Sequence, residues 1–167
     1  PSLIGETTRN ALNMNRSYVD LLCEVDMSRV SGVKRNPNKV RSLLRSLARN
    51  TSTLVDNSTL EEDMKIKENN ELSRNTISEY LNALSRLMIL YEQPAFNLHI
   101  RSSASLRKSP KRHLCDTSLA VAALGLEKES LIKDIKYAGF LFESLAIHEL
   151  NVYAKAKKIS DITRHIY

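Results

Sequence analysis

The segment SRNTISEYLNALSRLMILYEQ, residues 73–93, carries polar side chains whose types and spacing suit contact with DNA. Its first part predicts a helix whose buried stripe comprises Ile77, Tyr80, Leu81, Leu84, Leu87 and Met88. The opposite face offers groups that can bond base edges or phosphates, from Arg74, Asn75, Ser78, Asn82, Ser85 and Arg86. Glu79 lies on the same face, and its carboxylate would repel phosphate. The pattern therefore predicts either a DNA-reading helix or the solvated face of an interaction module.

A second candidate is the basic run between residues 101 and 112, which contains no acidic residue. Its cations are Arg101, Arg107, Lys108, Lys111 and Arg112. Contacts from such a loop to backbone phosphates would give affinity that depends steeply on salt and does not read sequence. No aromatic residue interleaves the cations, so base stacking is not indicated. A solvated loop, or one that docks against an acidic protein face, is the alternative interpretation.

Glu143 is a weak candidate for a catalytic or metal-binding carboxylate. Its neighbours on the predicted helix are apolar, namely Phe140, Ala146, Ile147 and Leu150. A carboxylate in such surroundings pairs with another group, binds a metal or rises in pKa. One carboxylate supplies too few oxygen ligands for Mg²⁺. We therefore expect Glu143 to be buried and bonded to backbone N–H groups or to Lys111, with no catalytic residue and no metal site.

Composition and missing motifs limit what the chain can do alone. The net charge of +6 permits an acidic partner such as nucleic acid. The sequence has no GxxxxGKS/T phosphate loop and no GxGxxG, HExxH or GxSxG motif, so we expect no ATP hydrolysis and no cofactor in this fragment. With no membrane-length apolar run and no secretory signal, we expect a cytoplasmic protein. Cys23 and Cys115 are expected to be buried free thiols.

The elements that would position these residues are mostly helices. Apolar spacing predicts one or two helices between residues 7 and 30, then a helix from Pro37 and another capped by Asn57 or Ser58. The helix from Pro37 buries Val40, Leu43, Leu44, Leu47 and Ala48, and its opposite face carries Lys39, Arg41, Arg45 and Arg49. In the next helix, Leu60, Met64 and Ile66 are expected to point inward. After the helix that begins at Ser73, MILYEQPAF and KRHLCD predict two strands around a long basic turn. This order is typical of a winged helix-turn-helix.

Beyond Asp116 the sequence predicts a small-residue helix closed by Gly125, then a longer helix, and a weak strand at DITRHIY. The fold class expected is mainly α, with a winged helix-turn-helix, N-terminal helices and a truncated α+β C-terminal part. The corresponding domains are residues 1–33, 34–115 and 116–167.

Four segments in order resemble one known family: SYVDLL…DMSRVSG…NPNKVRSLLRSLARNTST, SRNTISEYLNAL, LRKSPKRHLCDTSLAVAALG and AGFLFESLAIHEL. They are similar to the C-terminal half of bacterial and archaeal AAA-type ATP-binding proteins, a domain of unknown function grouped with restriction-endonuclease-like folds. The resemblance covers nearly the whole chain. It implies an N-terminal P-loop ATPase, which this chain lacks, so ATP and Mg²⁺ are expected only in that missing domain. It also places the helix acid of a nuclease-like site at Glu143, with the strand carboxylates expected after Tyr167.

Three functions follow as expectations. The first is a non-catalytic regulatory or DNA-binding winged-helix module that binds double-stranded DNA weakly and with strong salt dependence. The second is a remnant of a metal-dependent nuclease domain that uses Glu143. The third is a protein-interaction module that docks on its own ATPase domain. Self-association into a homo-oligomer is a further alternative, and no membrane partner is expected.

Overall fold

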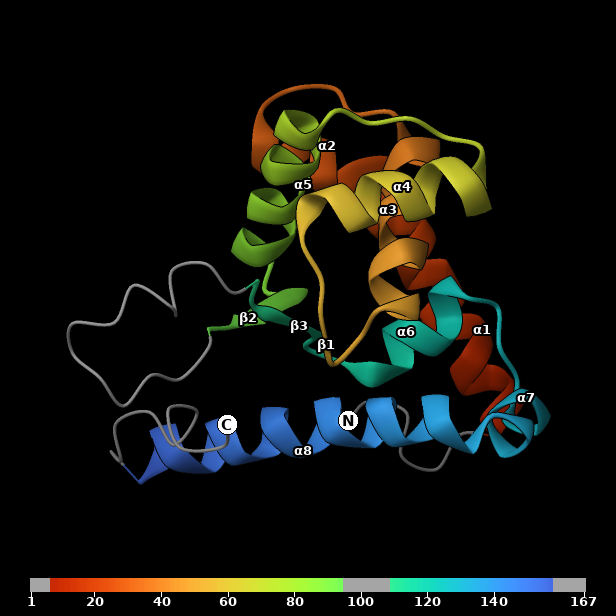
Figure 1. Cartoon of the computed structure of the whole chain (residues 1–167). Coiled ribbons are helices and arrows are strands. Elements are labelled where there is room, and N and C mark those ends of the chain that lie inside the picture. The colour runs from red at the N-terminus through yellow and green to blue at the C-terminus, as the bar shows by residue number, and fades with distance from the viewer. Residues whose placement is uncertain (1–6, 95–108, 158–167) are drawn as a thin grey trace.

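A computed structural model describes residues 7–94 and 109–157 as nine helical segments and three short strands (Figure 1). The N-terminal helices are α1 (Thr8–Leu21), the π-helical turn η1 (Leu22–Asp26) and α2 (Met27–Ser31). The middle of the chain forms α3 (Pro37–Arg49), β1 (Thr53–Leu54), α4 (Asn57–Glu68), α5 (Arg74–Arg86), β2 (Leu90–Gln93) and β3 (Lys111–Leu114). The last elements are α6 (Thr117–Ala123), α7 (Lys128–Lys133) and α8 (Ile135–Ala156). The prediction of a mainly α protein is therefore confirmed.

The three strands form one antiparallel sheet in the order β1-β3-β2. In this register Thr53 lies opposite Arg112, and Tyr91 lies opposite His113. The two predicted strands correspond to β2 and β3, whereas the short β1 was not predicted.

Helix starts follow from side-chain caps. Asn36 accepts hydrogen bonds from the backbone N–H groups of Asn38 and Lys39, and Pro37 occupies the first turn, so the predicted start of α3 is confirmed. Ser73 caps α5 as predicted, because its hydroxyl accepts from the N–H of Thr76. The cap of α4 was predicted one or two residues late. Asp56 is the cap, and hydrogen bonds from Thr59 and Ser58 lower its pKa to about 2.

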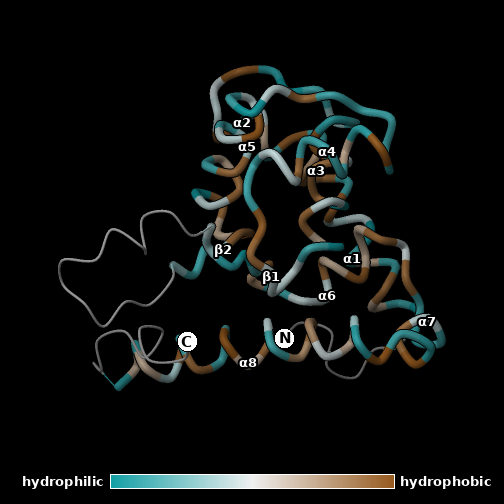
Figure 2. Tube along the Cα trace, in the orientation of Figure 1, coloured by the Kyte–Doolittle hydropathy of each residue, from teal (hydrophilic) through white to brown (hydrophobic). Residues whose placement is uncertain are grey.

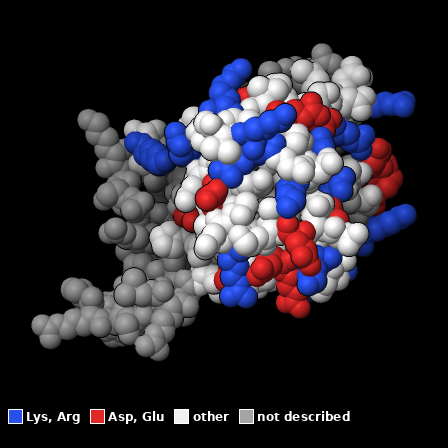
Figure 3. All heavy atoms as spheres, turned by 90° about the horizontal axis from the view of Figure 1, so that it is seen from above, with Lys and Arg blue, Asp and Glu red and all other residues white. Residues whose placement is uncertain are grey.

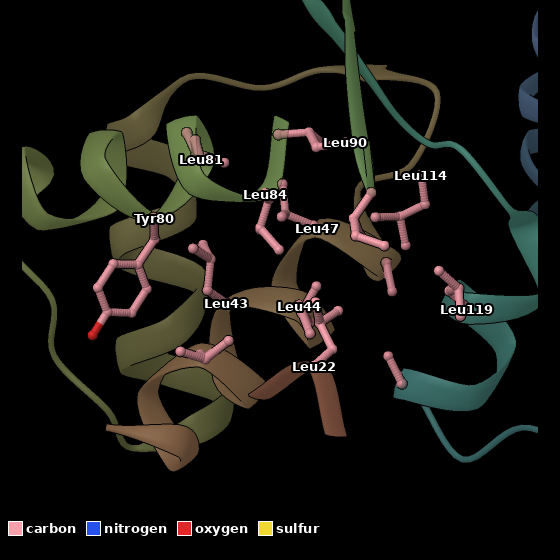
Figure 4. Close-up of a cluster of buried hydrophobic side chains, with 14 of the residues drawn as sticks. Leu22, Leu43, Leu44, Leu47, Tyr80, Leu81, Leu84, Leu90, Leu114 and Leu119 are labelled. Carbon is pink, nitrogen blue, oxygen red and sulfur yellow. The ribbon is translucent and has the colours of Figure 1, made fainter. Parts of the chain in front are cut away.

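The core lies where α1, α3, α5, α6 and the sheet meet. Leucines from several of these elements point toward one another, among them Leu22, Leu43, Leu47, Leu84, Leu114 and Leu119 (Figure 4). The whole predicted stripe of α3 is buried, and so are Ile77, Tyr80, Leu81 and Leu84 of α5. One buried cluster includes residues on both sides of the predicted boundaries at 33/34 and 115/116.

Two predicted inward residues are exposed. Met88 is 78% exposed because the chain leaves α5 through a left-handed turn at this residue, where φ is +57°. Ile66 is 67% exposed, on the outer side of α4. Short helices have few turns in which to show a stripe, so a single apolar residue is a weak signal of burial there.

The longer helix predicted near the C-terminus is α8, and Asp134 caps it by accepting from the N–H of Tyr137. α8 crosses beneath the sheet and α6, and no other described element covers its far side (Figure 1). Hydrophobic stretches recur along α8 (Figure 2). None of the helices in the described ranges is long and apolar enough to cross a membrane.

Candidate nucleic-acid interface

The outer face of α5 holds most of the residues predicted to contact DNA. Burial of Ile77, Tyr80 and Leu84 turns this face away from the core. Arg74, Asn75, Asn82, Ser85 and Arg86 are exposed on it, as predicted from helical spacing. Ser78 is only half-buried, but its hydroxyl accepts from Asn57 and donates to the carbonyl of Arg74. Ser78 is therefore engaged within the protein.

Two of the charged residues on this face, Arg74 and Glu79, are paired. The Arg74 Nε lies 2.8 Å from Glu61 Oε2, and Arg35 Nη1 lies 2.9 Å from Glu79 Oε2. The Arg35 guanidinium also lies 5.0 Å from the centre of the Tyr80 ring, a cation–π contact. Glu79 thus has a cation beside it, which reduces the repulsion that its carboxylate would exert on phosphate. Figure 3 shows basic and acidic side chains intermixed on the surface seen from above.

Arg112 was predicted to belong to a basic wing that contacts phosphate, and the structure contradicts this. Its side chain is buried and donates to Glu92 Oε1 at 2.7 Å, Val55 O at 2.7 Å and Asn57 Oδ1 at 2.9 Å. The guanidinium therefore ties β3 to β2 and to the start of α4, and a phosphate cannot reach it in this fold. The physical reason is strand alternation, which turns Arg112 to the opposite face of β3 from Lys111 and His113.

Lys111 meets Glu143, as expected from the sequence. The distance from Lys111 Nζ to Glu143 Oε1 is 2.6 Å. Glu143 was expected to be buried, but its side chain is 38% exposed, because the pair lies at the edge of the contact between β3 and α8. The remaining predicted wing residues, Arg101, Arg107 and Lys108, lie outside the described residues.

His113 is a residue that the sequence interpretation missed. Its ring is buried between the sheet and α8, with Nε2 3.1 Å from Gln93 Oε1 and Nδ1 3.3 Å from the hydroxyls of Ser52 and Ser144. A neutral ring with its proton on Nε2 can donate to Gln93 Oε1, which only accepts, and its Nδ1 can accept from the Ser144 hydroxyl, because the Ser52 hydroxyl donates to Phe140 O. Burial lowers the pKa of His113 to about 4. Period-two alternation in KRHL is the signal that could have separated His113 from Arg112.

Two further reactive groups are the cysteines. Cys23 and Cys115 are both free thiols; Cys23 is buried, and burial raises its pKa to about 11, whereas Cys115 is half-buried. Within the described ranges, no three His, Cys, Asp or Glu side chains gather where they could hold a metal ion. The described geometry can bind through hydrogen bonds and charge, and the contacts of His113 with Ser52 and Ser144 are buried.

No curated protein and no solved structure matches this chain. A family profile does match residues 1–130, from before α1 into α7, and leaves α8 outside the match. The chain therefore belongs to the family described as Domain of unknown function (DUF8612).

Proposed function

We propose that the chain is a non-catalytic winged-helix module that binds double-stranded DNA through the outer face of α5. The observation that carries the proposal is topological. The order α3, β1, α4, α5, β2, β3, with the sheet order β1-β3-β2, matches a helix-turn-helix followed by a wing. In that arrangement the second helix of the motif, here α5, enters the major groove.

The chemistry of α5 supports this role. Asn75 and Asn82 present amides that can bond a base edge in two places, and Arg86 presents a guanidinium suited to guanine or phosphate. The surrounding surface has mixed charge, so we expect weak binding with few phosphate contacts. By resemblance, the parent protein is proposed to be an AAA-type ATPase, with this module regulatory.

Fluorescence anisotropy with a labelled DNA duplex at low salt tests the proposal. The double variant Asn82→Ala, Arg86→Gln should bind at least several-fold more weakly than the parent chain. The slope of log affinity against log salt should fall by about one for each phosphate contact removed. Lys136→Gln, an exposed charge change on α8, is the matched control and should bind as the parent does. Undetectable binding, or equal loss in the control, contradicts the proposal.

A second candidate, a protein-interaction module, is favoured by α8. Its outer side exposes Ile135, Phe142, Leu145, Val152 and Tyr153, and Phe142 is 70% exposed. A helix that is apolar on both faces is usually buried on both, so further protein is the natural cover. The proposed partner is the ATPase domain that the resemblance implies, or a second copy of the chain. Sedimentation of the chain, alone and with the ATPase domain, should show association that Phe142→Asp abolishes and Lys136→Gln retains.

The nuclease-remnant alternative has less support. It rests on Glu143, whose carboxylate is already paired with Lys111. A divalent metal would have to displace that ammonium and find further oxygen ligands.

A further inference from the structure

An open cavity of about 450 Å³ lies among α1, α3 and α6, and no residue of α5 lines it. Four arginines form much of its wall: Arg16 from α1 and Arg41, Arg45 and Arg49 from α3. Its volume falls within the usual range of small-molecule sites, roughly 300–1,000 Å³. It is separate from the proposed DNA-binding face.

The sequence of α3 dictates this clustering. Arg41, Arg45 and Arg49 recur every four residues, so they line up on one side of the helix, about 6 Å apart along its axis. The apolar stripe of α3 faces the core, which turns the arginines outward. Asp20 of α1 and Glu68 of α4 approach the same side.

Arg49 is a structural member of the cluster. Its Nε and Nη2 lie 3.1 and 2.8 Å from Asp63 Oδ2, and its Nη1 lies 2.7 Å from Glu68 Oε1. All three of its nitrogens are thus engaged, and the arginine ties α3 to α4.

The other three arginines keep donors in reserve. Arg45 donates through Nε to the carbonyl of Ala123 and through Nη1 to Glu68, and no described residue accepts from its Nη2. Arg41 uses Nη2 for Asp20 and Nη1 for Asn38, which leaves Nε. For Arg16, the described residues accept only from Nη2, through Glu127 at 3.3 Å. The side chains of Arg45 and Arg16 are 45% and 37% exposed, so a ligand can reach them.

The residues that line the cavity include four guanidiniums and two carboxylates, Asp20 and Glu68. Outside the lining, Glu127, Glu24 and Asp63 lie 3.3, 3.9 and 2.8 Å from Arg16, Arg41 and Arg49 respectively. Guanidinium stays protonated at any physiological pH, and its planar donors fit paired oxygens of phosphate or carboxylate. A compact anion would use the N–H donors of Arg16, Arg41 and Arg45 from which no described residue accepts.

We propose that this arginine cavity binds a small ligand with two adjacent phosphoryl groups, of the diphosphate type. Arg16 of α1 and Arg45 of α3 bind the ligand, and Arg41 donates a further hydrogen bond. Arg49 fixes α3 to α4 and so keeps the cavity in shape. Two phosphoryl groups supply more charge and more acceptors in this volume than a dicarboxylate does.

Isothermal titration of the 167-residue chain with inorganic pyrophosphate, at fixed ionic strength, tests the proposal. We expect saturable binding at one site. Arg45→Gln and Arg16→Gln should each weaken it at least tenfold, and Arg29→Gln, an exposed arginine on α2, should change it less than twofold. Melting curves identify any variant that fails to fold. Arg16 makes one exposed ion pair, so Arg16→Gln is expected to fold and still tests the site if Arg45→Gln is unstable.

Absence of saturable binding, or equal loss in Arg29→Gln, overturns the proposal. Malonate, titrated in the same way, should bind at least tenfold more weakly than pyrophosphate; equal binding overturns the choice of phosphate. Arg45→Gln should still bind duplex DNA as the parent chain does, so failure of this site and failure of the DNA-binding role are separate results.

Discussion

The carboxylate of Glu143 and the ammonium of Lys111 form a half-exposed pair, so their contribution to stability is modest. We expect Glu143→Gln to lower the free energy of unfolding by roughly 1 kcal/mol or less, the usual value for such pairs. Urea denaturation measures this, and Glu149→Gln, exposed on the same helix, is the control. Mg²⁺ should leave the melting temperature of the parent chain unchanged. A rise of several degrees that vanishes in Glu143→Gln would contradict the pairing and restore the nuclease alternative.

His113 makes stability depend on pH. Its pKa falls from 6.5 to about 4 in the folded protein, chiefly through burial; nearby Glu143 raises it and Lys111 lowers it. Between these values the unfolded chain binds more protons, so stability is lost as pH falls from 6.5 toward 4. The loss could reach roughly 3 kcal/mol, from about 1.4 kcal/mol per pKa unit. His113→Gln should flatten this slope in urea denaturation at pH 7, 5.5 and 4.5; an unchanged slope would contradict the assignment.

The roles of single residues were harder to predict than the elements that carry them. The basic run was interpreted by residue type alone, which placed Arg112 with Lys111. Strand alternation separates them, and it places Lys111 and His113 together on the face of β3 that contacts α8. Contacts between segments far apart in sequence, such as Ser52 with the carbonyl of Phe140, leave no local pattern to recognise.

At the level of elements, two glycines have opposite roles. Gly125 ends α6 with φ of +64°, whereas Gly139 lies inside α8, and an added Cβ meets nothing within 4 Å at either position. Gly125→Ala should therefore cost about 1 kcal/mol, because only backbone strain changes. Gly139→Ala should stabilise the chain by up to about 1 kcal/mol through helix propensity. Thermal unfolding measures the melting temperature of both variants. If the two melting temperatures shift in the same direction, the opposite roles of the two glycines are contradicted.

Helices with a complete apolar stripe could be predicted from the sequence, but the residues at which helices begin and end were harder to predict. α3 and α5 repeat apolar residues over three turns, which identifies both the helix and its buried face. The cap of α4 was predicted at Asn57 or Ser58 and not at Asp56, because Asp, Asn and Ser can all cap a helix. The turn at Met88 was missed because methionine rarely adopts a left-handed conformation, and the sheet that follows imposes it.

For the whole molecule, we expect no turnover of ATP. The chain lacks a phosphate loop, and the arginine cavity offers no ligand for Mg²⁺ besides two paired carboxylates. A phosphate-release assay with Mg²⁺ and ATP measures this. Activity that stays with the chain through further purification would contradict the expectation.

The way α8 is attached has a consequence for dynamics. Polar contacts hold much of it: the Lys111–Glu143 pair, the His113–Ser144 contact, and the Tyr137 hydroxyl donating to Ala48 O. Of its described residues, Leu141 belongs to the central core and Tyr137 packs against that core. Opening α8 therefore exposes Leu141, Ile147 and Ala154, whereas opening α3 exposes Val40, Leu43, Leu44, Leu47 and Ala48 and dissolves the core. We expect amide hydrogens of α8 to exchange with solvent through local opening, orders of magnitude faster than those of α3, which exchange only when the whole chain unfolds.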